Sequence, residues 1–171
     1  MPTSIHKRRE KLLAEARNKN LRQLLLRATR ALNGLLLDGL KTRGHDDVRL
    51  THCALLANLD LDGDSLSGLA ARANMTKQAA GQLAKELQTR GYIVLKKDPR
   101  DARSRTVCFT NAGWTLMMDS FKIVEDVEER CSQVLGDQTM DGLRTGLAAF
   151  IGAYGVDQAV APEPSAGLEE A

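Results

Sequence analysis

The sequence predicts a mainly α-helical protein that contains one small antiparallel β-hairpin. Three observations support this fold class. Apolar residues recur at three- and four-residue steps near both ends of the chain, which is the spacing of amphipathic helices. Short helical patterns, each preceded by a capping residue, occupy the middle of the chain. Two short β-type runs then flank a strongly charged loop.

The first long amphipathic helix lies in the N-terminal part of the chain. Arginines occupy its polar side, and Gly44 with the polar run 45–47 ends it. The helix and the connection after it form the region 21–49, and a basic extension over residues 1–20, for which a helical form is one option, precedes it. The apolar stripe contains Leu21, Leu24, Leu25, Ala28, Leu32, Leu35, Leu36 and Leu40.

The central region 50–110 combines three shorter helices with the hairpin. Thr51, Ser65 and Thr76 are suited to cap these helices, because a hydroxyl accepts a hydrogen bond from a free N–H of the first turn. The order helix, turn, helix, strand, charged loop, strand is that of a winged helix-turn-helix. The third helix covers residues 76–90, the strands cover 92–95 and 107–109, and the loop covers 96–105.

Two further amphipathic helices are expected over residues 111–155, with Gly136 ending the first of them. The small, acidic and proline-containing segment 156–171 predicts a disordered tail. A single winged unit offers too little apolar surface to cover all the terminal helices, so a second copy of the chain is expected to cover them. The residues expected at this homodimer interface are Leu21, Leu24, Leu25, Leu143, Leu147, Phe150, Ile151 and Tyr154.

Charge is segregated along the chain, although the net charge is only +2. Residues 1–30 carry nine basic and two acidic side chains, and residues 72–105 carry nine and three. Residues 111–171 carry three basic and eleven acidic side chains. Two basic blocks opposed to an acidic one are typical of a surface that faces a polyanion.

The helix over residues 76–90 is the first candidate contact with a polyanion. Its apolar inner face, from Ala80 to Leu87, leaves polar side chains and the small Ala79 and Gly81 on the outside. Gln pairs well with adenine, and Lys reaches guanine or a phosphate, so we expect this helix in a major groove. The residues predicted to contact DNA are Thr76, Lys77, Gln78, Gln82 and Lys85.

The charged loop is the second candidate contact. It places five cations within ten residues, and a polyphosphate partner would relieve their mutual repulsion. Arg100, Arg103 and Arg105 are expected at a minor groove, with Asp101 orienting one of the guanidinium groups. A solvated hairpin that uses charge to block edge pairing is the alternative, but the preceding helix-turn-helix favours DNA.

The wing signature resembles that of the MarR family (multiple antibiotic resistance regulators). It consists of Asp101-x-Arg103, five residues, and Phe109-Thr110-x-x-Gly113, with Phe109 standing where the family usually has Leu. The order and spacing of Leu50-Thr51, Leu66-x-x-Leu69-Ala70 and the run from Met75 to Tyr92 are also similar to the family's. The resemblance extends over roughly residues 21–154.

The resemblance implies a homodimeric transcription regulator, most often a repressor, that binds a pseudo-palindromic double-stranded operator. It also implies release by a small aromatic or phenolic effector bound between the dimerisation and DNA-binding lobes. His52 is the one candidate for an effector-pocket residue that the sequence offers. Some relatives bind zinc, but the candidate ligands here, His45, Asp46, Asp47, His52 and Cys53, have no recognised spacing, so no metal and no cofactor are expected.

Other classes of protein find little support in the sequence. The glycine-containing run 34–42 lies within a leucine stripe, and the run 60–71 lacks the Gly and Glu of a calcium loop, so no enzyme is expected. No apolar run approaches the roughly 18 residues of a membrane span, which predicts a cytoplasmic protein without membrane association. The runner-up function is a winged-helix interaction module that binds an acidic protein, and a peripheral membrane role for residues 1–30 would leave the wing unexplained.

Overall fold

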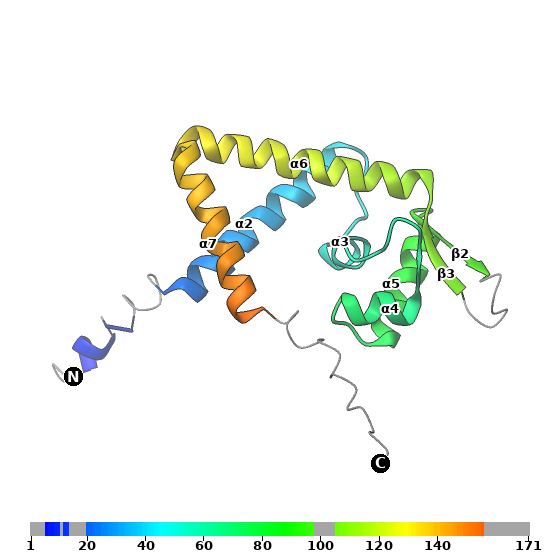
Figure 1. Cartoon of the computed structure of the whole chain (residues 1–171), viewed down its shortest axis with the longest axis horizontal. Helices are drawn as coiled ribbons and strands as arrows, with labels where there is room; N and C mark the ends of the chain where they lie inside the picture. The colour runs from blue at the N-terminus through cyan, green and yellow to red at the C-terminus, as the bar shows by residue number, and fades with distance from the viewer. Residues whose placement is uncertain (1–5, 11, 14–19, 98–104, 156–171) are drawn as a thin grey trace, which may run out of the picture. The chain divides into compact units, whose positions relative to one another are not determined.

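The computed structural model of the chain describes residues 6–10, 12–13, 20–97 and 105–155. It confirms a mainly helical protein with a small antiparallel sheet (Figure 1), and it divides into two compact units, residues 1–127 and 128–171. No helix of the described residues is long and apolar enough to cross a membrane. The elements are α2 (Leu21–Thr42), α3 (Leu50–Leu56), β1 (Asp64–Ser65), α4 (Leu66–Arg72), α5 (Lys77–Thr89), β2 (Ile93–Lys97), β3 (Arg105–Phe109), α6 (Asn111–Leu135) and α7 (Asp137–Tyr154).

Most helix ends follow the expected capping chemistry. The Ser65 hydroxyl accepts from the Gly68 N–H at 3.0 Å, and the Thr76 hydroxyl accepts from the Ala79 N–H at 3.1 Å. Gly91 and Gly136, which follow α5 and α6, have φ angles of +78° and +82°, in the left-handed region that favours glycine.

The prediction that Thr51 caps α3 is wrong. The N-cap residue is Arg49, whose backbone N–H donates to Nδ1 of His52 at 3.2 Å. This contact with the third helical residue accompanies a start of α3 at Leu50, one residue before Thr51.

The sheet has three strands in the order β1-β3-β2, all antiparallel. β2 and β3 pair from Ile93↔Phe109 to Lys97↔Arg105, so both strands reach two residues further into the loop than predicted. The sequence analysis missed β1, which pairs Asp64 with Val107. Two residues without alternation carry no strand signal, and they form a strand only because the exposed edge of β3 is there to pair with.

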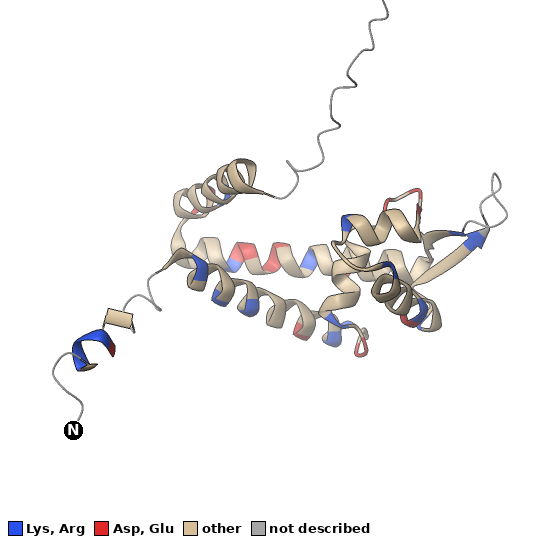
Figure 2. Ribbon diagram, turned by 90° about the horizontal axis from the view of Figure 1, so that it is seen from below, with Lys and Arg blue, Asp and Glu red and all other residues tan. Residues whose placement is uncertain are grey.

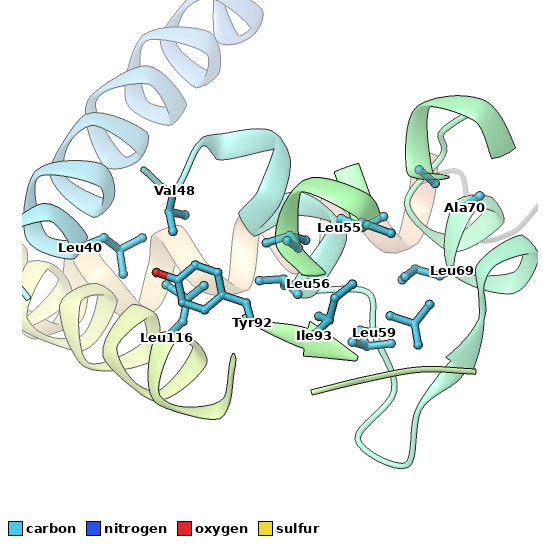
Figure 3. Close-up of a cluster of buried hydrophobic side chains, with 14 of the residues drawn as sticks. Leu40, Val48, Leu55, Leu56, Leu59, Leu69, Ala70, Tyr92, Ile93 and Leu116 are labelled. Carbon is cyan, nitrogen blue, oxygen red and sulfur yellow. The ribbon is translucent and has the colours of Figure 1, made fainter. Parts of the chain in front are cut away.

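The core of the first unit joins the winged part of the chain to the end of α2 and the start of α6 (Figure 3). Leu40 from α2, Leu55 from α3 and Leu116 from α6 are at most 1% exposed. They pack in one cluster with Leu87 of α5 and Val107 of β3, so the hairpin and the helix before it share a single core. Burial of such leucines stabilises by about 1.5–3 kcal/mol each.

The second unit consists of the end of α6 and α7. Arg144 pairs with Glu128 at 2.8 Å and with Asp141 at 3.1 Å, which ties the two helices together. Much of the apolar side of α7 remains exposed, including Phe150 at 45% and Ile151 at 58%. Polar side-chain contacts therefore link α7 to the end of α6, while the apolar side of α7 stays largely uncovered.

Candidate nucleic-acid interface

Helix α5 has one buried and one exposed side, as predicted. Ala80, Ala84 and Leu87 are 0%, 2% and 0% exposed, and they face the core. The opposite side is polar, and its only apolar side chain in the first turn is that of Ala79. The structure brings all five predicted DNA-contacting residues to this side, each of them exposed: Thr76, Lys77, Gln78, Gln82 and Lys85.

Gly81 does not lie as the sequence suggested. It is half-buried, and a Cβ at this position would be 3.7 Å from Cδ2 of Leu66 in α4. The small residue therefore faces the neighbouring helix of the helix-turn-helix. The turn between these helices contains Asn74 with a φ angle of +50°, a conformation that Asn adopts more readily than most residues.

Some cations of the basic block over residues 72–105 form ion pairs within the protein, and others do not. Arg72 pairs with Asp60 at 3.2 Å and Asp64 at 2.5 Å, while Arg90 pairs with Asp47 at 2.6 Å. These two guanidinium groups stabilise the fold. Among the described residues, the cations of this block that form no ion pair are Lys77, Lys85, Lys96 and Arg105.

The wing is described only at its base. Arg105 is exposed at the start of β3, opposite Lys97 at the end of β2. The predicted wing residues Arg100, Asp101 and Arg103 lie outside the described residues. The strand pairing sets Lys97 and Arg105, the residues on either side of that segment, opposite each other.

A second row of cations follows α2 (Figure 2). Arg22, Arg27 and Arg30 are exposed on this helix and form no ion pair with any described residue. Acidic side chains of α6 pair instead with Arg43 and Lys122. On the exposed surface of the first unit, unpaired basic side chains of α2 are therefore separate from the acidic side chains of α6, in line with the charge pattern of the sequence.

A cluster centred on Glu86 connects α5 to the start of α3, and the sequence analysis missed it. The Glu86 carboxylate accepts from the Arg49 guanidinium, from Nε2 of His52 at 3.1 Å and from Nε2 of Gln82 at 3.1 Å. Gln82, Glu86 and Arg90 are spaced four residues apart, and this spacing was the available signal. Arg49 and His52 could not be inferred, because they come from another helix.

His52 is fully buried, and it does not line either of the two cavities beside α3 that are described below. Its Nδ1 accepts from the Arg49 backbone, and its Nε2 faces Glu86. That His52 lines an effector pocket thus stays a prediction, and neither of these two cavities includes it. Among the described residues no group of three or more His, Cys, Asp or Glu side chains could hold a metal ion.

Acid is expected to destabilise the protein through His52. Burial, followed by the nearby Arg49 and Arg90 guanidinium groups, lowers the pKa of His52 below its ordinary 6.5. The unfolded chain then takes up a proton that the folded chain resists, so the free energy of unfolding falls as the pH drops below about 6.5. Urea unfolding at neutral and acidic pH should show a weaker pH dependence for His52→Gln, whereas His6→Gln at an exposed site should match the parent. An unchanged pH dependence in His52→Gln would contradict this assignment.

Two apolar cavities meet beside α3. One has a volume of about 260 Å³ between α2, α3 and α6, and the other of about 450 Å³ lies between α2, α3 and Met75. Leu36, Cys53 and Ala57 line both cavities, and no charged side chain lines either. Burial raises the pKa of the Cys53 thiol, which keeps it neutral. The only polar groups are those of Asn33, Thr51, Cys53 and Ser120.

The residues predicted at a dimer interface remain largely uncovered in the single chain. In the first unit Leu21 and Leu24 are 55% and 49% exposed, and in the second unit Leu143 and Tyr154 are 49% and 78% exposed. Leu25 and Leu147 are half-buried. Each unit thus exposes an apolar helix face of its own.

Comparisons with known proteins agree with this architecture. Residues 46–104 match the model of the MarR family. No curated protein sequence is significantly similar to the chain. Among solved structures, RV1404 from Mycobacterium tuberculosis is 20% identical, with a TM-score of 0.67 and coverage of 77% of this chain and 90% of that one.

Two further similar structures contain bound molecules. CouR from Rhodococcus jostii RHA1, bound to p-coumaroyl-CoA, is 23% identical with a TM-score of 0.60, covering 78% of this chain and 92% of that one. The transcriptional repressor CouR bound to a 23-mer DNA duplex is 22% identical with a TM-score of 0.64, covering 79% and 94%. At these identities the likeness shows a shared fold, and the family model matches residues 46–104. The central part of the chain is therefore similar to the MarR family, and the chain shares the winged-helix fold of these structures.

Proposed function

We propose that the protein is a transcription regulator that binds a double-stranded, pseudo-palindromic operator and acts as a repressor. The observation that carries this proposal is the exposed polar side of α5, which presents Lys77, Gln78 and Gln82 opposite a fully buried face. The unpaired cations near it supply the phosphate contacts that position a protein on DNA. A DNA-bound repressor of the same fold supports this role.

A homodimer is part of the proposal. A pseudo-palindromic operator requires two copies of α5 related by a two-fold axis. The exposed apolar faces of α2 and α7 are the surfaces we assign to the second copy, because large uncovered apolar patches are rare on monomers. The alternative of a protein-interaction module is less well supported, since α5 exposes no large apolar side chain.

Gln78→Ala is expected to relax base preference at one position in each half-site by about 1–3 kcal/mol. A Gln amide discriminates between bases through paired hydrogen bonds, whereas it adds little to binding of random DNA. The measurement is a gel shift on the operator, on single-base variants and on random DNA.

Gln88→Ala is the matched control for this experiment. It makes the same change at an exposed position in the last turn of α5, away from the turns assigned to the groove. It should leave base preference unchanged. Equal losses on operator and random DNA for Gln78→Ala would refute its role in base recognition.

We also assign the two cavities beside α3 to a small effector that releases DNA. Their linings lack any charged side chain, so a buried carboxylate would have no cation partner. A neutral aromatic ring fits the apolar walls, and its hydroxyl can pair with Ser120 or Asn33. Of the aromatic and phenolic effectors that the sequence suggested, the cavities thus favour a neutral phenol over an aromatic acid.

A neutral alkylphenol is expected to weaken operator binding at neutral pH at concentrations where benzoate does not. Desolvating the carboxylate of benzoate without a partner costs several kcal/mol, a penalty that the phenol avoids. The measurement is operator binding by fluorescence anisotropy during titration with each compound. Ala57→Leu narrows both cavities and should reduce the phenol effect, and equal responses to the two compounds would contradict the assignment.

A further inference from the structure

The amide of Gln82 is held from within the protein, although its side chain is exposed on α5. Its Nε2 donates to Oε1 of Glu86, one helical turn further on, at 3.1 Å. An ionised carboxylate only accepts hydrogen bonds, so the amide nitrogen must face Glu86 and the amide oxygen must face away. The second N–H of the amide group donates to no other residue in the described part of the chain.

Glu86 is itself fixed by two groups from the start of α3. Its other oxygen, Oε2, accepts from the Arg49 guanidinium and from Nε2 of His52 at 3.1 Å. Glu86 is about one-quarter exposed, and His52 is fully buried. These charge-assisted contacts hold the carboxylate in one position.

The tautomer of His52 follows from the helix cap. Nδ1 accepts from the Arg49 backbone N–H at 3.2 Å, so the ring proton of the neutral imidazole is on Nε2 and points to Glu86. A chain of contacts thus connects the N-cap of α3, through His52 and Glu86, to the Gln82 amide, and the Arg49 guanidinium also lies 3.1 Å from Nε2 of His52.

We infer that Glu86, held by Arg49 and His52, is a positioning residue for base recognition by Gln82. This inference rests on the proposed DNA-binding function and assigns a role to a residue that does not itself touch DNA. With its oxygen directed outward and a second N–H to donate, Gln82 matches the donor and acceptor pair of adenine. A flipped amide would present its nitrogen outward and suit the acceptors of guanine or thymine instead.

The test is a double-mutant cycle on operator variants. All four base pairs are placed at each half-site position, and binding is measured for the parent, Gln82→Ala, Glu86→Gln and the double variant. Gln82→Ala should lower discrimination at one position by about tenfold. Glu86→Gln, whose side-chain amide can also donate, should lower discrimination at that same position, and the double variant should lose no more than Gln82→Ala alone.

Two further variants keep the result interpretable. Arg49→Gln removes one partner of Glu86 at a position whose side chain is 56% exposed, and it should cause a smaller loss at the same base pair even if Glu86→Gln fails to fold. Glu129→Gln, an exposed carboxylate on α6, should change nothing.

The outcomes separate this inference from the proposed function. If the parent discriminates between operators but Glu86→Gln and Arg49→Gln leave the Gln82 position unchanged, the positioning role is overturned and the DNA-binding function stands. The role is also overturned if Gln82→Ala changes no position. If the parent binds every DNA equally, the proposed function fails, and the inference fails with it.

Discussion

Raising the salt concentration from 50 to 200 mM is expected to weaken operator binding about 10³- to 10⁵-fold. The physical reason is that each lysine or arginine on a phosphate releases a condensed counterion, and two copies of the chain are expected to neutralise six to ten phosphates. The exposed cations of α5 and of the hairpin base that form no ion pair within the described part of the chain supply these contacts. The measurement is operator affinity by fluorescence anisotropy across this range, together with the number of chains bound per duplex.

Two substitutions show which cations are responsible. Arg105→Gln at the base of the wing should reduce the slope of log affinity against log salt by about two for a dimer, one for each lost phosphate contact. Lys122→Gln is the matched control, because Lys122 is already paired with Asp126 at 3.2 Å and should leave the slope unchanged. Binding that stays flat between the two salt concentrations would exclude the proposed mechanism, and one chain per duplex would exclude the dimer.

Gly113→Ala is expected to lower the free energy of unfolding by about 3 kcal/mol, at the upper end of the usual cost of overpacking. Gly113 lies in the first turn of α6, where a Cβ would collide with the Tyr92 carbonyl oxygen. That oxygen accepts from the Thr110 N–H at 3.1 Å, and the Thr110 hydroxyl in turn accepts from the Gly113 N–H at 3.1 Å. The first turn of α6 thus packs directly against the backbone of Tyr92, just before β2. No flexible side chain lies between them that could move aside.

Chemical denaturation of the parent and two variants checks this expectation. Gly34→Ala places a methyl group in open space on α2, where it should stabilise the helix by about 0.5–1 kcal/mol. A similar small gain for Gly113→Ala would show that α6 does not need this close approach. The same Gly-to-Ala change is expected to lower the free energy of unfolding at position 113 and to raise it at position 34. This difference separates the effect of packing from that of helix propensity.

The sequence alone determined the local features of this protein. Apolar spacing marked both faces of α5, hydroxyl residues marked the starts of α4 and α5, and glycines marked the ends of α5 and α6. These features follow from interactions within a few residues, so a linear pattern contains them completely. The polar residues exposed on α5 were predicted for the same reason.

Only the tertiary structure decided which distant residues meet. β1 is a strand because β3 offers it an edge, Gly81 faces Leu66 because α4 packs beside it, and Glu86 gains Arg49 and His52 from another helix. The same packing engages Arg72 and Arg90 in ion pairs and leaves the two cavities beside α3 without charge. Such contacts depend on which surfaces the shared core brings together, and no spacing along the chain encodes that arrangement.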